Sequence, residues 1–328
     1  MWVKAAGMPA HARPALAGLV LDTSAWQAAP MTSATSADTD TLPPLVTSFA
    51  ALAPRYDLVL CDVWGVLHNG AQGSMPAADA LQRARAGGAT VLLVSNAPRP
   101  AEGVARILDG FGIPRDAYDG IVTSGMVTNA LLAERPGAKM WHLGPERDLG
   151  IYDGLDLTLT GLDDAELIVC TGLFDDTVET PDDYADTLKA AKARELPFIC
   201  ANPDIVVERG GELIWCAGAI AEAYAELGGD VVFCGKPHRP IYETAFKVAA
   251  KLRGGAVDAS RAIAIGDALR TDLAGALGVG IDCLFVAAGI HAGELGLEHG
   301  AEVDPKALER LLADGPGRPV AVTTRLAW

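Results

Sequence analysis

Short apolar runs and longer helical stretches alternate along most of the chain. Five runs rich in Leu, Ile, Val and Ala predict buried strands, at residues 56–61, 89–95, 120–124, 261–266 and 282–288. Because these runs are apolar at nearly every position, they are typical of a parallel sheet covered on both faces. Helical periodicity predicts helices between them, at residues 77–86, 101–111, 241–252 and 271–277. The alternation predicts a doubly wound α/β fold.

The middle of the chain begins a second alternation of the same kind. Strands are expected at residues 138–143, 165–172 and 196–200, and helices at 182–194 and 219–227. Since the earlier strand pattern returns afterwards, we predict an α/β domain, residues 137–229, inserted into a core made of residues 45–136 and 230–328. Residues 1–44 are expected to form a flexible tail, with Met31 as an alternative start; a signal peptide is less favoured because no convincing cleavage pattern follows.

Composition narrows the range of partners. The 328 residues include 26 Lys and Arg against 42 Asp and Glu, which gives a net charge of −16. This acidic balance argues against nucleic acid or an anionic membrane as a partner, because both are bound by cationic side chains. A small phosphorylated substrate is not excluded, since one metal ion and one lysine would balance its charge. The six cysteines form no C-x-x-C pair, which favours free buried thiols in a reducing, cytoplasmic compartment.

Polar side chains follow three of the predicted strands and a further apolar strand at residues 230–234, at the positions where open α/β sheets place ligand sites. In chain order they are Asp62, the pair Ser95 and Asn96, Lys236, and the pair Asp267 and Asp272. A buried aspartate is costly to charge without a cation or hydrogen bonds, and two carboxylates five residues apart suit Mg²⁺. Lys236 lacks the glycine pattern of a P-loop. Taken singly, each motif is also explained by strand-end caps, turns or a helix N-cap.

In their order and placement these residues resemble the four motifs of the haloacid dehalogenase superfamily. The insert resembles that superfamily's class IIA cap, and its segment Ala201-Asn202-Pro203-Asp204 and the block 235–246 resemble the p-nitrophenyl phosphatase and sugar- or nucleotide-phosphatase branch. The resemblance covers residues 56–288. It implies a Rossmann-like parallel core with an inserted C2-type α/β cap, and a Mg²⁺-dependent phosphatase acting on a small phosphorylated metabolite; it leaves room for a homodimer.

The resemblance also implies a role for each motif residue. Asp62 would be the nucleophile that forms an aspartyl-phosphate, Ser95 and Asn96 would hydrogen-bond the phosphoryl oxygens, and Lys236 would orient Asp62. Mg²⁺ would be held by Asp62, the backbone carbonyl of Trp64 and Asp267, with Asp272 holding a water of the ion or Lys236. Asn202 and Asp204, on a cap loop, would contact the leaving group.

Trp64 is the main departure from the pattern. Phosphatases of this superfamily carry a second aspartate at this position as general acid and base, and an indole has no proton to give near neutral pH. Because dehalogenases of the superfamily have an aromatic residue there, a dehalogenase-like or phosphonatase-like hydrolase stays open, as does a weakly active ligand-binding protein. His68, His238 and His291 are candidates to replace the missing acid, and each is also explained as a structural residue.

Overall fold

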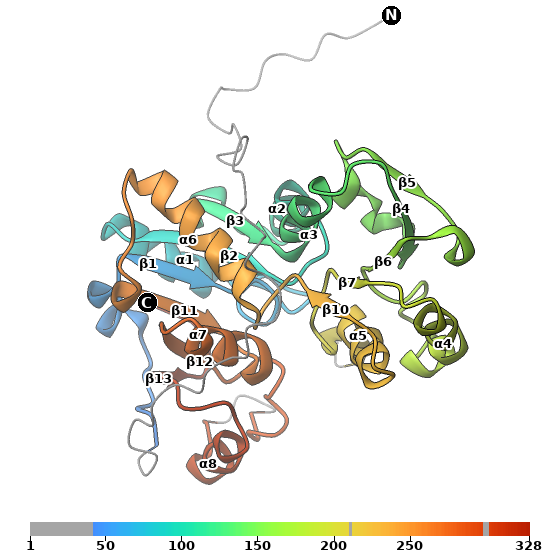
Figure 1. The fold of residues 1–328 in the computed structure, drawn as a ribbon. Coiled ribbons are helices and arrows are strands. Elements are labelled where there is room, and N and C mark those ends of the chain that lie inside the picture. The colour runs from blue at the N-terminus through green and yellow to red at the C-terminus, as the bar shows by residue number, and fades with distance from the viewer. Residues whose placement is uncertain (1–41, 210–211, 298–301) are drawn as a thin grey trace, which may run out of the picture.

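A six-stranded parallel sheet forms the larger of two layered units in the structure, a computed structural model that describes residues 42–209, 212–297 and 302–328 (Figure 1). The strand order is β13 (Ala321–Thr323), β12 (Asp282–Val286), β11 (Ala262–Gly266), β1 (Leu58–Cys61), β2 (Thr90–Ser95) and β3 (Gly120–Thr123). The tail predicted at residues 1–44 lies outside the described residues except for its last three. Pro44 accepts a hydrogen bond from the backbone of Val322 in β13.

Helices cover both faces of this sheet, as the apolar strands predict. Alternate residues of β1 point to opposite faces, so Leu58 and Leu60 belong to one buried cluster and Val59 and Cys61 to another. The first cluster includes side chains of α6 (Arg239–Arg253) and α7 (Ala274–Gly278). The second includes those of α1 (Met75–Ala86) and α2 (Ala101–Gly110). The doubly wound fold expected from the sequence is therefore confirmed.

The strand order places a topological switch point between β1 and β11. The chain runs from β1 outward to β2 and β3, and from β11 outward in the other direction to β12 and β13. Cys61 lies opposite Ile265 in the β1–β11 pairing. The residues that follow these two strands, Asp62 and Asp267, therefore emerge side by side at the edge where doubly wound sheets bind ligands.

A second parallel sheet belongs to the insert. Its order is β10 (Val231–Phe233), β7 (Phe198–Cys200), β6 (Leu167–Cys170), β4 (Ala138–Leu143) and β5 (Leu157–Leu159). Helices α4 (Ala185–Ala193) and α5 (Ala217–Glu226) pack with β6 and β7, while residues of α3 (Ser124–Ala133) share a buried cluster with β4. β10 pairs with this sheet, so a division by sheet membership falls after Phe233 rather than at residue 229. The domain boundaries otherwise stay a prediction.

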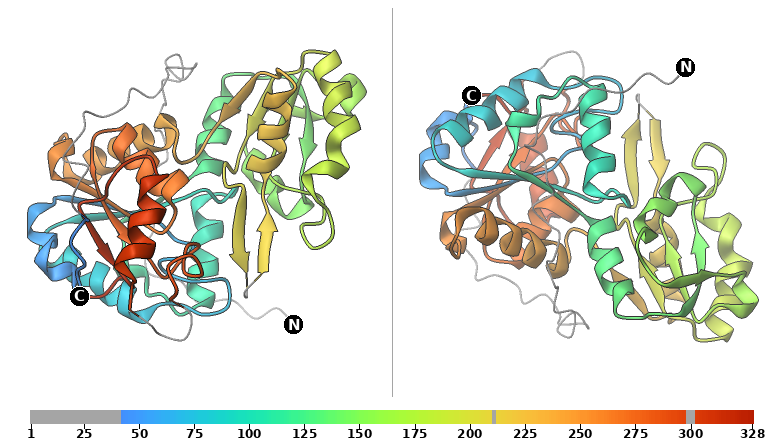
Figure 2. Two further views of the ribbon diagram at one scale, coloured as in Figure 1. Left: turned by 90° about the horizontal axis from the view of Figure 1, so that it is seen from below. Right: turned by 90° about the horizontal axis from the view of Figure 1, so that it is seen from above.

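An antiparallel hairpin of β8 (Val206–Arg209) and β9 (Glu212–Trp215) lies between the insert and the core (Figure 2). The sequence did not predict this hairpin, nor α3, β5, β13 and α8 (Pro305–Ala313). Short 3₁₀ segments occur at Phe49–Ala51, Ala53–Arg55, Arg115–Ala117, Glu146–Tyr152, Leu162–Asp164, Pro181–Tyr184 and Ala259–Arg261, and a π-helical turn, Leu269–Leu273, leads into α7. All six cysteines are free and buried, as expected. In the part of the chain that the structure describes, every helix is too short or too polar to cross a membrane.

Candidate active site

Three aspartates meet at the switch point of the larger sheet. Asp62 follows β1, Asp267 follows β11, and Asp272 lies in the turn before α7; one oxygen of each lies within 4.8 Å of the others. The Nζ of Lys236 is 2.6 Å from Asp62 Oδ1 and 2.7 Å from Asp272 Oδ1. Sequence positions spread over two hundred residues thus form one buried cluster, as the strand-end argument predicts.

Glycines hold this cluster at close range. A Cβ on Gly65, whose φ is +84°, would lie 2.1 Å from Asp267 Oδ2, and one on Gly289 would lie 1.9 Å from the same atom. A Cβ on Gly266 would lie 2.0 Å from the Cγ of Asp272. The backbone therefore approaches both carboxylates as closely as only glycine permits. The backbone N–H of Ile290 donates to Asp267 Oδ2 at 2.7 Å and fixes its orientation.

The charges of the cluster do not balance within the chain. Three carboxylates face one ammonium group, which leaves a deficit of two positive charges in a buried place. Burial, together with Asp272, raises the pKa of Asp267 to about 7, and the same two causes raise the pKa of Asp62 well above its usual value. Burial alone would lower the pKa of Lys236, but Asp272 and Asp62 hold it well above its usual range. Buried oxygen donors with this charge fit a hard divalent cation such as Mg²⁺.

A hydrogen-bond network ties the lysine to the insert. Asn96 Oδ1 accepts from the backbone N–H of Lys236 at 2.7 Å, while Asn96 Nδ2 donates to the Lys236 carbonyl at 3.1 Å and to Asp204 Oδ1 at 2.9 Å. The Asn96 amide is thus occupied in positioning Lys236, and its contact with a phosphoryl group stays a prediction. Burial raises the pKa of Asp204, opposed by the charge of Lys236 and the hydrogen bond from Asn96.

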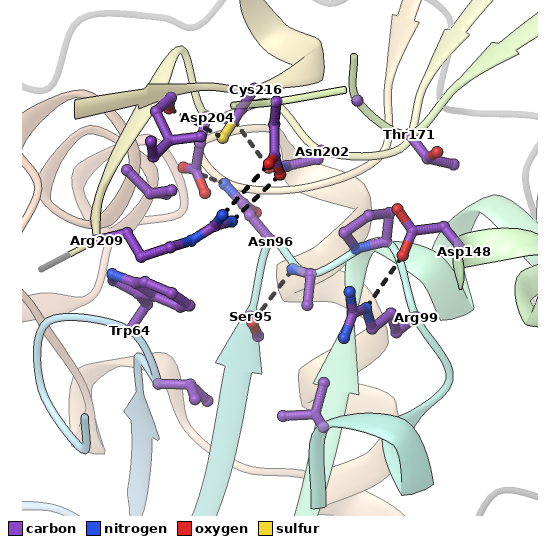
Figure 3. A pocket seen from close by; sticks show the side chains of 18 of the residues that line it. Trp64, Ser95, Asn96, Arg99, Asp148, Thr171, Asn202, Asp204, Arg209 and Cys216 are labelled. Carbon is purple, nitrogen blue, oxygen red and sulfur yellow. Dashed lines mark hydrogen bonds and ion pairs between the residues drawn. The ribbon is translucent and has the colours of Figure 1, made fainter. Parts of the chain in front are cut away.

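A cavity of about 180 Å³ lies over Asp62, between the core and the insert (Figure 3). Ser95 lines it from the end of β2; its Oγ accepts from the backbone N–H of Ala97 at 3.2 Å, so its own hydroxyl proton stays free to donate. Asn202 and Asp204 line it from the insert. A second cavity, of about 230 Å³, shares Asp62 and Asp204 with the first and reaches Asp267. Asp62 is therefore reached by one cavity beside Ser95, where the phosphoryl group is predicted, and by another beside Asp267, where the metal ion is predicted.

Comparison with known proteins agrees with this geometry. The sequence profile of haloacid dehalogenase-like hydrolases matches residues 59–158, and a HAD-hydrolase-like profile matches residues 233–312. A solved hydrolase of the haloacid dehalogenase-like family from Brucella suis is 48% identical with a TM-score of 0.76, and the match covers 86% of this chain and 99% of that one. The chain belongs to the haloacid dehalogenase-like hydrolases.

Two characterised relatives are more distant from this hydrolase. The D-glycerol 3-phosphate phosphatase of Mycobacterium tuberculosis is 29% identical over 247 residues, which are 74% of this chain and 66% of that protein. The acid sugar phosphatase of Staphylococcus saprophyticus is 29% identical over 202 residues, 60% of this chain and 73% of that protein. The chain thus spans just under two thirds of the mycobacterial relative.

In this hydrolase, a hydrogen bond and a close backbone contact hold the indole of Trp64. Its Nε1 donates to the backbone carbonyl of Glu208 in β8 at 2.8 Å. Gly70 approaches its ring so closely that a Cβ there would lie 2.8 Å from the indole. The residue two positions after Asp62 therefore binds the hairpin of the insert.

The three candidate histidines differ in their surroundings, and a role for any of them as the acid stays a prediction. Burial lowers the pKa of His68 to about 4; its Nδ1 accepts from the backbone N–H of Gly70 at 3.1 Å, and its ring stacks on Phe111. Burial likewise lowers the pKa of His238 to about 4. The Nε2 of His291 accepts from the backbone N–H of Leu269 at 3.4 Å. With pKa values near 4, His68 and His238 present no imidazolium at neutral pH that would act as a general acid.

Sequence reasoning missed three arginines in the cavity wall. Arg99 follows Ser95 by four residues, Arg147 lies in the segment Glu146–Tyr152, and Arg209 ends β8. They come from three separate elements with no common motif. The sequence offered one signal that could have found Arg99, its position just beyond a strand end, and none for the other two arginines.

Proposed function

We propose that this hydrolase is a phosphatase that cleaves small phosphate monoesters through an aspartyl-phosphate on Asp62. The observation that carries the proposal is the buried cluster of Asp62, Lys236, Asp267 and Asp272 at the switch point, with its deficit of two positive charges. The two characterised relatives are phosphatases of a glycerol phosphate and of sugar phosphates by name, which supports a small phosphorylated substrate.

The chemistry assigned to the chain is a two-step displacement. A carboxylate oxygen of Asp62 attacks phosphorus, a new O–P bond forms, and the ester oxygen leaves with the electron pair of the broken bond; water then releases phosphate from Asp62. Lys236 holds the attacking carboxylate at 2.6 Å, and the Ser95 hydroxyl donates to a phosphoryl oxygen. When bound by Asp62, Asp267 and Asp272, a divalent cation neutralises charge on the transferring group.

Phosphate release from a substrate panel tests this proposal. The panel contains p-nitrophenyl phosphate, sugar phosphates, nucleoside monophosphates and pyridoxal phosphate, each with Mg²⁺. Asp62→Asn should lower turnover by more than about 10³-fold, as loss of a nucleophile does. Asp79→Asn, on the surface of α1 beside Arg83, is the matched control and should change nothing. Full turnover by Asp62→Asn would reject the assignment.

One observation favours a second candidate, a dehalogenase-like hydrolase. Trp64 puts an aromatic ring where an acidic side chain is expected, and carbon–halogen cleavage needs no acid there. The three-carboxylate cluster opposes this reading, since that reaction needs no divalent cation. Haloacids therefore belong in the same panel. Halide release without phosphate release would replace the phosphatase proposal, and tight binding without any turnover would make the protein a ligand-binding family member.

A further inference from the structure

The three arginines of the cavity wall form a basic surface beyond the predicted phosphoryl site. Arg99, Arg147 and Arg209 line the same cavity as Asp62 and Ser95. Figure 3 shows Arg99 and Arg209 in this wall. Arg99 enters from the core, and Arg147 and Arg209 from the insert. A substrate whose phosphoryl group sits on Asp62 extends its leaving group into the space that these side chains bound.

Two acids pair with these arginines and do not neutralise them. Arg99 Nε lies 3.1 Å from Asp148 Oδ1, while Asp176 is shared between Arg147, at 2.6 Å, and Arg209, at 3.2 Å. Three guanidinium groups therefore face two carboxylates, which leaves one positive charge of this wall in surplus. Asp62 and Asp204, which line the same cavity, contact Lys236 and Asn96 instead. A guanidinium carries five N–H donors, and within the described residues the two terminal nitrogens of Arg99 have no protein acceptor.

The arrangement presents donors to the cavity and hides acceptors behind them. The Asp148 and Asp176 side chains are 4% and 11% exposed, against 31% to 51% for the three arginines. Thr171, in the same wall, has a buried hydroxyl without a hydrogen-bond partner among the residues that the structure describes. Around the three arginines the wall therefore offers more donors than acceptors, as a site for an anionic oxygen group does.

We propose that this wall is an anion subsite, and that the substrate is a phosphomonoester whose leaving group carries a second anionic group, a carboxylate or a second phosphate. This inference rests on the proposed phosphatase function and narrows its substrate class. Bidentate pairing of guanidinium with an oxyanion gives such a subsite both affinity and orientation. A neutral or cationic leaving group would leave the surplus charge without a partner.

Calorimetry with phosphonates tests the subsite without turnover, because their C–P bond is not cleaved by ester hydrolysis. Propylphosphonate has a neutral end, 3-phosphonopropionate a carboxylate end and propane-1,3-diphosphonate a second phosphonate end. In the presence of Mg²⁺ we expect at least one of the two compounds with an anionic second end to bind about tenfold or more tightly than propylphosphonate, as charge-assisted hydrogen bonds predict. The larger preference identifies carboxylate or phosphate as the group recognised.

Arginine variants test whether the preference for an anionic second end depends on the three arginines of the cavity wall. Arg99→Gln and Arg209→Gln should each lower it by about fivefold or more, since each removes a charged donor. Arg83→Gln, on the outer face of α1, is the matched control and should keep it. If Arg99→Gln fails to fold, the same binding preference is measured in Arg147→Gln instead. Equal binding of all three compounds, or a preference untouched in the arginine variants, overturns the subsite. Failure of the phosphatase function is separate: no compound of the substrate panel would then release phosphate.

Discussion

The indole nitrogen of Trp64 donates a 2.8 Å hydrogen bond to the backbone carbonyl of Glu208, and this contact joins the loop after β1 to the hairpin of the insert. The next residue of that hairpin is Arg209, whose guanidinium lines the cavity over Asp62. Trp64 stands where the family resemblance leads us to expect an acid. The loop after Asp62 therefore has no carboxyl proton at this position, and its indole contacts the insert instead.

Trp64→Phe should loosen the hairpin. Phenylalanine keeps an aromatic ring against Gly70 but loses the hydrogen bond to Glu208. The bond contributes about 1 kcal/mol, so local opening of β8 and β9 should rise about fivefold. Hydrogen exchange of residues 206–209 and 212–215, followed by mass spectrometry, measures this. Trp141→Phe, on β4, is the control and should leave the hairpin unchanged; equal exchange in wild type and Trp64→Phe would contradict the role of the contact.

Asp267→Asn should weaken metal binding more than Asp272→Ala. Asp267 accepts from the Ile290 backbone and has no ion-pair partner among the described residues, so its charge is available to a metal ion. Asp272 already pairs with Lys236 at 2.7 Å. Calorimetry with Mg²⁺ should show a loss of about tenfold or more for Asp267→Asn, since loss of even a residue that only supports a ligand typically costs about 10–100-fold. Asp282→Asn, at the opposite end of the sheet, serves as control. Unchanged affinity in Asp267→Asn would reject the site.

Stability should fall as the pH falls from about 6.5 toward 4. Burial lowers the pKa of His68 and His238 to about 4, while the same side chains in the unfolded chain titrate near 6.5. Between these values the unfolded chain binds protons that the native protein does not, so protonation favours unfolding. Each histidine contributes a slope of about 1.4 kcal/mol per pH unit. Urea unfolding at several pH values should give a smaller slope for His68→Asn than for wild type; equal slopes would show that His68 is protonated in the native state.

The acidic cluster was predictable because strand ends meet at one edge of a parallel sheet. Asp62 and Asp267 each follow an apolar run, and the register Cys61 opposite Ile265 brings them together. Lys236 follows β10, which pairs with the insert sheet rather than the core, yet the chain still delivers it to the same edge. Local pattern and general topology were sufficient for these residues.

The cavity wall was not predictable in the same way. Trp64 meets Glu208 across 144 residues, so this contact exists only once the insert has docked on the core. Arg209 pairs with Asp176 across 33 residues of the insert, which no local pattern predicts. The hairpin itself escaped prediction because β8 and β9 are four-residue strands, only partly buried, with little apolar alternation. Docked surfaces leave no periodicity in a single sequence.

The leaving-group dependence of the proposed phosphatase should expose the missing acid. A positioned general acid contributes about 10²–10⁴-fold to rate, mostly for basic leaving groups. An alkyl phosphate leaves as a strongly basic alkoxide, whereas p-nitrophenolate is a weak base. Because Trp64 has no proton to give and His68 is neutral, wild type should turn over p-nitrophenyl phosphate much faster than a sugar phosphate.

Trp64→Asp should narrow this margin by restoring an acid. Trp64→Asn is the matched control. Asparagine has nearly the size of aspartate and loses the same contact to Glu208, but it has no carboxyl proton. Comparison of the two separates proton donation from loss of the hairpin contact, which both variants share. The ratio of kcat/KM for the two substrates should fall about tenfold or more in Trp64→Asp alone, near the lower end of general acid effects. If both folded variants bind Mg²⁺ and keep the wild-type ratio, proton donation at this position does not limit the reaction.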